Sequence, residues 1–155
     1  MRQLRAYWQE QKGYVTLFVL LYCLMAAALF SAEYFRLMGV QEEVEGILQR
    51  ATTVTLEAKL RDPLRWDFTT ELDQNSLASA FDYFLRYDCK LDSLYRRKAP
   101  DGNIIWRIEV TMLSTSANPP SVEVQGVIHT ASFLSFLMGE VQIPFAVGSR
   151  TVRLD

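Results

Sequence analysis

The sequence predicts an α+β fold, in which a long N-terminal helix packs on a small antiparallel sheet of four or five strands with one short extra helix. Three observations predict it. Twenty uncharged residues occur in a row near the N-terminus, apolar residues then recur at helical spacing, and the hydrophobic period later changes to two. They divide the 155 residues into a leader (1–13), a transmembrane helix (14–32), its amphipathic continuation (33–62) and a distal α+β domain (63–155).

The first element is the uncharged stretch from Gly13 to Ala32. A helix of about 20 apolar residues spans the roughly 30 Å hydrocarbon core of a bilayer. Basic residues precede this stretch, whereas acidic residues dominate residues 33–45. Because positive residues flank the cytoplasmic end of a span, we expect the N-terminus in the cytoplasm and the rest of the chain outside. Residues 131–138 are apolar, but they are too few to carry the chain across the membrane a second time.

The second element is an amphipathic continuation of the same helix. Apolar residues recur three or four positions apart, at Leu37, Val40, Val44, Ile47, Leu48, Ala51, Val54 and Ala58. Gly39 and Gly46 each lower helix propensity by roughly 1 kcal/mol without breaking the pattern, and Asp62-Pro63 ends it. We therefore expect one helix over residues 14–61, apolar all round at first and along one stripe later. That stripe needs a cover.

The remaining elements supply the cover. Asn75-Ser76 is a cap signal for a short helix over residues 76–88. After it, alternating residues predict a strand over 90–98, a turn at 99–103, a strand over 104–114 with Trp106, Ile108, Val110 and Met112 on one face, a turn at 118–120 and a strand over 121–130. Two closing strands follow, over 141–147 and 150–154, separated by Gly148-Ser149. Pro144 restricts its strand to an edge or a bulge.

Composition and motifs exclude several function classes. A net charge of −2 gives no reason to expect nucleic acid as a partner. The sole histidine, His129, lies in a strand pattern far along the chain from Cys89, so a catalytic arrangement of the two is not expected and a partly exposed strand histidine is. The sequence has neither zinc-ligand spacing nor a glycine-rich phosphate loop. We expect no enzyme activity, cofactor or metal.

Other polar and thiol groups also have ordinary explanations. The carboxylate pairs Glu42/Glu43 and Asp88/Asp92 are expected to be solvated charges, as is the basic run 96–98. Cys23 lies in the middle of the predicted span, so it is not expected to pair with the distal Cys89. We expect Cys89 to behave as a small buried hydrophobe.

The N-terminal constellation is more specific. A basic leader ends in Gln11-Lys12-Gly13, and a hydrophobic helix follows at once. This resembles the class III signal of type IV pilin-like proteins, which a membrane peptidase cuts after the glycine on the cytoplasmic side. Residues 11–60 are similar to the TadE-like pseudopilins of tight-adherence pilus systems, through KGYVTLFVLL and EYFRLMGVQEEVEGILQRATTVTLEA. The closing stretch VIHTASFLSFLMGEVQIPFAVGSRTVRLD also resembles their last strands.

The resemblance implies a pilin-like minor subunit of a Tad-type pilus or related secretion machine, with a pilin-like fold. Its processing site would be Lys12, Gly13 and Tyr14, and its partners would be the membrane, a prepilin peptidase, other pilin-like subunits and the pilus or secretion platform. It implies a location in the cytoplasmic membrane, or in a surface filament once assembled. Helix-packing residues are expected at Phe18, Ala26, Ala27, Ala28, Ser31, Ala32, Val40, Val44, Ile47, Leu48 and Ala51, and the small residues from Ala26 to Ala32 would permit close approach of neighbouring helices.

One residue departs from the family pattern. The family usually has a glutamate at the fifth position of the mature helix, and here that position is Phe18. In pilins this carboxylate is thought to pair with the N-terminal amine of a neighbouring subunit, which favours assembly in register. Phe18 therefore leaves incorporation into a filament open, or suits a subunit at a tip or in an initiating complex.

Three other hypotheses stay open at this point. The chain could be a signal-anchored, single-pass binding module that recognises a partner outside the membrane without forming a filament. It could instead carry a removable secretory signal cut after Ala32, although Phe30 at position −3 is not small. An enzyme would need convergent polar groups in a pocket and a role for His129.

Overall fold

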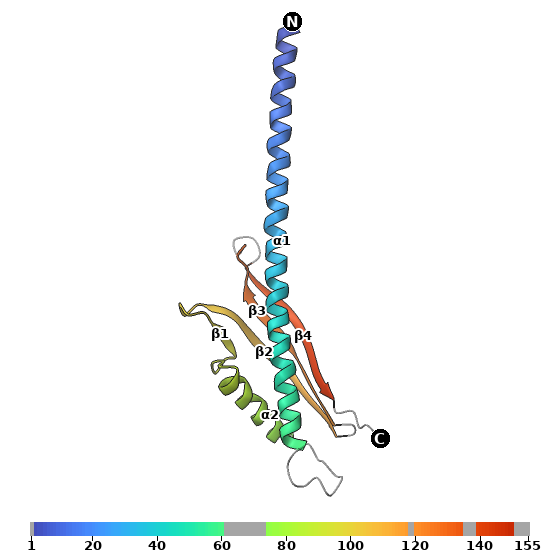
Figure 1. Cartoon of the computed structure of the whole chain (residues 1–155), viewed down its shortest axis with the longest axis vertical. Coiled ribbons are helices and arrows are strands. Elements are labelled where there is room, and N and C mark those ends of the chain that lie inside the picture. Colours follow the sequence, from blue (N-terminus) through green and yellow to red (C-terminus); the bar gives the residue numbers. More distant parts are fainter. Residues whose placement is uncertain (1, 61–73, 118–119, 135–138, 151–155) are drawn as a thin grey trace. The chain divides into compact units, whose positions relative to one another are not determined.

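The computed structural model describes residues 2–60, 74–117, 120–134 and 139–150. The chain forms two compact units, Met1–Met38 and Gly39–Asp155. Its elements, in chain order, are the helix α1 (Arg2–Leu60), the helix α2 (Gln74–Tyr83), the π-helix η2 (Phe84–Asp88) and the strands β1 (Arg96–Lys98), β2 (Ile104–Ala117), β3 (Pro120–Ala131) and β4 (Glu140–Arg150) (Figure 1). The predicted α+β layout is confirmed.

Helix α1 runs for 59 residues without interruption. It includes residues 2–13, which the sequence analysis assigned to a separate leader, and it continues through Gly39 and Gly46. Both glycines have open space around them, so neither marks a close contact. The helix ends at Leu60, and the predicted stop signal Asp62-Pro63 lies outside the described residues.

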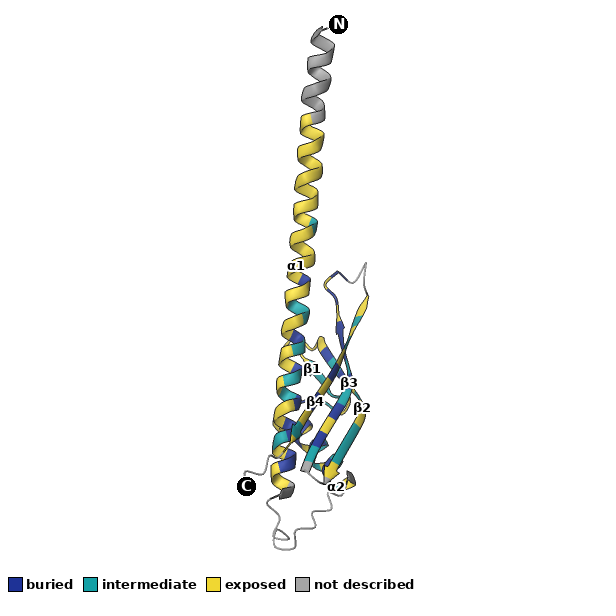
Figure 2. Cartoon of the chain, turned by 90° about the vertical axis from the view of Figure 1, so that its right-hand side faces the viewer, coloured by how far each residue is buried: buried dark blue, intermediate teal, exposed yellow. Residues whose placement is uncertain are grey.

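Within the second unit, α1 buries one stripe. Val40, Val44, Leu48 and Ala51 are buried in the core, and Ile47 packs partly buried against it. Figure 2 shows this stripe facing the sheet. The last turns differ from the prediction, because Val54 and Ala58 are exposed while residues at four-residue steps from Leu48 are buried, namely Thr52 and Leu56. Each four-residue step turns about 40° past a full turn, so the stripe moves around the helix.

The sheet is a four-stranded antiparallel meander in the order β1-β2-β3-β4. Its buried face alternates with the exposed face along β3 and β4, as the period of two predicted. Trp106 on β2 is fully buried, and its indole N–H donates to a Glu43 carboxylate oxygen on α1 at 3.2 Å. This bond satisfies the buried donor and ties β2 to the helix stripe.

Both outer strands differ from the prediction in length. Only Arg96–Lys98 of the expected strand 90–98 is extended, because Lys90 and Tyr95 have φ of 55° and 51° and bend the chain. The predicted turn at 99–103 is confirmed by a hydrogen bond from the Ala99 amide to the Asn103 carbonyl at 2.8 Å.

At the other edge, β4 runs without a break through Gly148-Ser149, which was wrongly predicted to be a turn. Gly148 and Ser149 pair with Glu123 and Val122 in the ladder, so one strand replaces the two expected. The prediction that Pro144 lies at an edge is confirmed. Residues 151–154 of the second predicted closing strand and the turn residues 118–119 lie outside the described residues.

A bulge in β2 changes which residues face the core. Val110 pairs with Gly126 and Met112 with Gln125, so Thr111 is an extra residue on β2. As a result Met112 is half exposed, contrary to the prediction, and Leu113 packs against the core instead.

The short helix differs slightly from its prediction. It begins at Gln74, before the expected cap Asn75-Ser76, and its last turn is the π-helix η2. Its apolar face packs into the core as expected, through Leu77, Phe81, Phe84 and Leu85.

The crowding at Gly126 yields a stability prediction. A Cβ there would overlap the Glu109 carbonyl oxygen and come within 2.7 Å of the Phe145 ring. We expect Gly126→Ala to lower the free energy of unfolding by about 2 kcal/mol or more, as overpacking does. Urea unfolding of the full chain in detergent micelles, followed by tryptophan fluorescence, measures it.

The matched control is Gly46→Ala, on the exposed side of α1, where a Cβ meets nothing within 4 Å. This control should raise the free energy of unfolding by up to about 1 kcal/mol, because alanine is the better helix former. Equal stabilities of the two variants would contradict the packing described for β2 and β3.

Candidate functional site

The most unusual surface of the molecule is the apolar helix of the first unit. Large apolar side chains from Tyr14 to Phe30 are exposed on every side of α1 (Figure 2). Exposed apolar patches on soluble proteins rarely exceed a few hundred Å². Each buried large apolar side chain stabilises a structure by roughly 1.5–3 kcal/mol relative to exposure. A surface of this size therefore requires a nonaqueous cover.

A lipid bilayer fits this requirement by length and composition. The uncharged stretch from Gly13 to Ala32 would extend about 30 Å as a helix, which matches a hydrocarbon core. Its backbone polar groups are bonded within the helix, as lipid demands. The helix is thus long and apolar enough to cross a membrane and is compatible with a single-pass anchor.

The predicted processing residues lie on this helix. Gly13 and Tyr14 are helical and exposed, and a Cβ on Gly13 would meet nothing within 4 Å. Lys12 is helical, but its side chain is not among those described. Gly13 is therefore not required by packing within the chain, and a larger residue would fit there without strain.

The predicted helix-packing residues divide into two groups. Those after Gly39 lie in the core of the second unit, as described above. Those before it face outward along the apolar helix, with Ala26 partly covered and the others exposed, namely Phe18, Ala27, Ala28, Ser31 and Ala32. The Ser31 hydroxyl donates to the Ala27 carbonyl at 2.8 Å, so this polar group is satisfied within the helix.

An ion pair follows directly after the apolar stretch. Arg36 donates to Glu33 through Nε at 2.8 Å and through Nη2 at 2.9 Å, which is a two-bond fork. The bond to Glu33 raises the pKa of Arg36 more than burial lowers it. In the sequence these charges indicate topology, but their three-residue spacing on a helix is also a signal that they can pair.

His129 is the centre of a second polar group, on β3. It is buried at 8% exposure, and so is less accessible than the sequence predicted. Its Nε2 lies 3.1 Å from Glu109 on β2, and its Nδ1 lies 3.5 Å from Glu140 on β4. The two carboxylates thus lie near different ring nitrogens. Among the described residues, no group of His, Cys, Asp or Glu is arranged to hold a metal.

A third polar group joins α2 to the loop before β1. Asp82 accepts hydrogen bonds from Arg86 Nε at 2.8 Å and from the Tyr95 hydroxyl. The pKa of Tyr95 is raised, chiefly by burial of its hydroxyl and secondly by the hydrogen bond to the Asp82 carboxylate. Cys89 packs partly buried against the core. The pKa of its thiol is raised, chiefly by burial and secondly by the negative charge of Asp88. A protonated thiol is a poor nucleophile, so the arrangement indicates a structural role.

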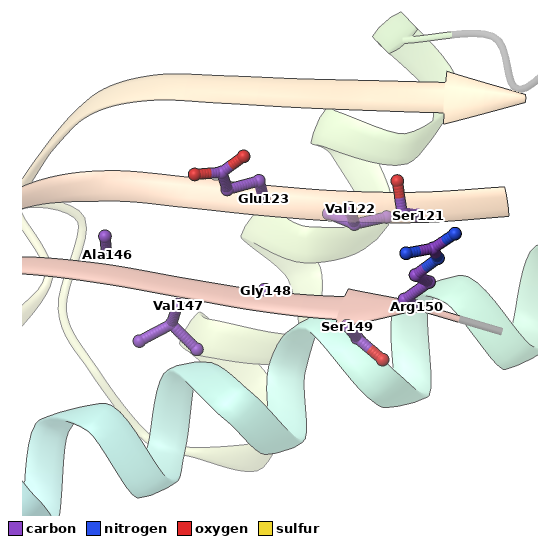
Figure 3. Close-up of a pocket in the computed structure, with 8 residues that line it drawn as sticks. All are labelled: Ser121, Val122, Glu123, Ala146, Val147, Gly148, Ser149 and Arg150. Carbon is purple, nitrogen blue, oxygen red and sulfur yellow. The ribbon is translucent and has the colours of Figure 1, made fainter. Parts of the chain in front are cut away.

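The hollow at the ends of β3 and β4 is shallow. It has a volume of about 270 Å³, and its lining includes Gly148, which carries no side chain (Figure 3). Glu123 and Arg150 contribute its charged side chains. Its polar lining also includes the hydroxyl groups of Ser121 and Ser149.

Comparison with known proteins adds no identification: no family model, curated protein or solved structure matches the chain.

The loop before β1 yields a pH prediction. Burial alone would raise the pKa of Asp92, but bonds from the Arg96 amide and side chain, the Leu94 amide and Lys98 outweigh it and hold that pKa below its usual range. The group thus adds stability that is present above about pH 4 and is lost as the pH falls toward the depressed value. We expect Asp92→Asn to lower the thermal midpoint at pH 7 and to flatten its decline below pH 4.

The exposed residue Asp88 provides the control for this measurement. Thermal unfolding of Asp88→Asn should follow the unmodified protein across the same pH range. An Asp92→Asn curve parallel to the unmodified protein down to pH 2 would contradict the role assigned to Asp92.

The apolar helix yields a labelling prediction. Cys23 is exposed on the helix, midway along the apolar stretch. In native membranes we expect a membrane-impermeant maleimide to leave Cys23 unmodified until sodium dodecyl sulfate is added, because lipid surrounds the thiol. In a Cys89→Ala background, Tyr87→Cys on the exposed face of η2 is the positive control for reagent access. Equal labelling of both thiols in intact membranes would show that lipid does not surround Cys23.

Proposed function

We propose that the protein is a pilin-like minor subunit, a pseudopilin, of a Tad-type pilus or related secretion machine. It is processed after Gly13 and assembled through α1. The observation that carries the proposal is the continuity of α1, which passes from the leader through an apolar stretch into the core of an antiparallel α+β domain as one helix. An anchor that only tethers a domain needs no such continuity.

Charge asymmetry supports a defined orientation for this subunit. Arg2, Arg5 and Lys12 precede the apolar stretch, whereas carboxylates dominate residues 33–45. The basic end of a span stays in the cytoplasm, so we place the leader there and the sheet on the outer side. This puts Gly13 at the cytoplasmic face, where a prepilin peptidase cuts the proteins that the leader resembles.

The exposed face of α1 supports assembly with similar helices. Alanines and Ser31 line part of the apolar helix, and small residues allow helix backbones to approach closely. Exchanging lipid for such neighbours costs little, because both are apolar. Other pilin-like subunits and the platform of the machine are therefore the partners that we propose.

Phe18 supports a minor rather than a repeating role. It lies on the exposed apolar surface at the position where pilins usually carry a glutamate. Without a carboxylate, this helix cannot form the ion pair with a neighbouring N-terminal amine that favours register in a filament. A tip or an initiating complex needs fewer such contacts than a filament shaft.

The mature N-terminus tests the proposal. We expect protein recovered from native membranes to begin at Tyr14, and to retain Met1 in cells without the prepilin peptidase. Gly13→Leu should also block processing. Since a Cβ at Gly13 meets nothing within the chain, the substitution leaves the helix intact and reports on cleavage alone. N-terminal mass spectrometry measures all three.

Gly39→Ala is the control, because Gly39 also lies in open space on α1 and outside the signal. It should be processed normally. An intact Met1 in the unmodified protein would instead indicate a signal-anchored binding module, and a start at Glu33 would indicate a secreted domain. Either result would overturn the proposed function.

A further inference from the structure

Two aromatic rings stand out on the outer part of the first unit. Tyr34 is 60% exposed and Phe35 is 71% exposed. Their ring centroids lie 5.9 Å apart, and the ring planes make an angle of 69°. Adjacent helix residues point about 100° apart, so the two rings cover a broad sector of the helix surface.

We propose that Tyr34 and Phe35 are an interfacial anchor, which binds the headgroup region of the outer leaflet and sets the depth of α1 in the bilayer. The inference rests on the membrane insertion assumed in the proposed function and deepens it, by naming the residues that meet the lipid interface. The occupant of this surface is lipid and not a protein partner.

The position of the rings along the helix supports lipid as the occupant. They follow the last uncharged residue, Ala32, by two and three positions. At about 1.5 Å per residue, they lie roughly 3–5 Å beyond an apolar stretch that matches the hydrocarbon thickness. Tyrosine is enriched at this level because its apolar ring and polar hydroxyl suit a boundary between lipid and water, and Phe35 adds apolar area beside Tyr34. At the other end of the stretch, Tyr14 lies one position inside its first residue, Gly13.

The charges beside the rings are compatible with this depth. Glu33 and Arg36 flank the aromatic pair in sequence and form the two-bond fork described above. Glu33 is 2% exposed, so its carboxylate is turned away from the open surface that the rings occupy. The open helix surface at this level therefore carries two aromatic rings, and the charges next to them in sequence neutralise each other. Such a surface is suited to the headgroup layer.

The difference in labelling rate between two thiols on either side of the proposed boundary tests the inference. In a background with Cys23→Ala and Cys89→Ala, Ser31→Cys and Met38→Cys place single thiols at exposed positions on either side of the rings. The full chain is reconstituted in vesicles of phosphatidylethanolamine and phosphatidylglycerol, and a membrane-impermeant maleimide is added outside. We expect Met38→Cys to react at least about tenfold faster than Ser31→Cys.

The decisive variant is Tyr34→Ala combined with Phe35→Ala. Without the rings, the depth of the helix is less restricted, and the ratio of the two labelling rates should fall at least about threefold. The matched control is Tyr83→Ala combined with Tyr87→Ala, which removes another exposed aromatic pair, stacked at 4.4 Å on the distal domain. That control should leave the ratio unchanged.

Each remaining outcome overturns the inference. An unchanged ratio in the Tyr34/Phe35 variant would show that the rings do not set the depth. Slow labelling of both thiols would place the rings in the hydrocarbon core. Fast labelling of both thiols in vesicles, with a difference in labelling rate only in native membranes, would make a protein the occupant. A mature start at Tyr14 together with any of these results would leave the proposed function standing and remove the anchor alone.

Discussion

The constraint on which the rest of this structure depends is that the apolar surface of α1 must be covered along its whole length. The helix contributes to both compact units, Met1–Met38 and Gly39–Asp155. Its later part satisfies the constraint within the chain, because a stripe from Val40 to Leu56 is buried in the core of the second unit. Its earlier part is apolar on all sides and is left open by the chain. A nonpolar surrounding for that part is therefore a requirement of the fold.

The functional account follows from this division of the helix surface. The sheet side carries polar contacts within the domain, such as the hydrogen bond between His129 and Glu109, and a shallow hollow at the ends of β3 and β4. The apolar helix, by contrast, offers a surface that lipid can cover, small residues that allow other helices to approach closely, and a glycine, Gly13, that packing does not require. A subunit that moves between lipid and a bundle of similar helices would use these properties together. A plain anchor would use only the first of them.

Much of the fold could be predicted because it depends on local periodicity. The continuous helix, the antiparallel strands and the edge position of Pro144 all follow from spacing and turn chemistry. The errors arose where tertiary pairing decides the outcome. The bulge at Thr111 reverses the facing of Met112, and ladder pairing keeps Gly148 in a strand although its residue type suggests a turn. For the candidate site, the exposed helix was predictable from composition, whereas the environment of His129 depends on which strands are neighbours.

The account is tested most directly by digesting intact spheroplasts with trypsin and identifying the fragment that stays in the membrane. If α1 crosses the bilayer with its basic end inside, the distal domain should be digested, and a short fragment that contains the apolar stretch and ends at or beyond Arg36 should survive. In cells without the prepilin peptidase, disruption of the membrane should then expose the leader, with Arg2, Arg5 and Lys12, to the protease. Full protection of the domain, or release of an intact protein without a membrane fragment, would contradict the central claim that lipid covers the first part of α1.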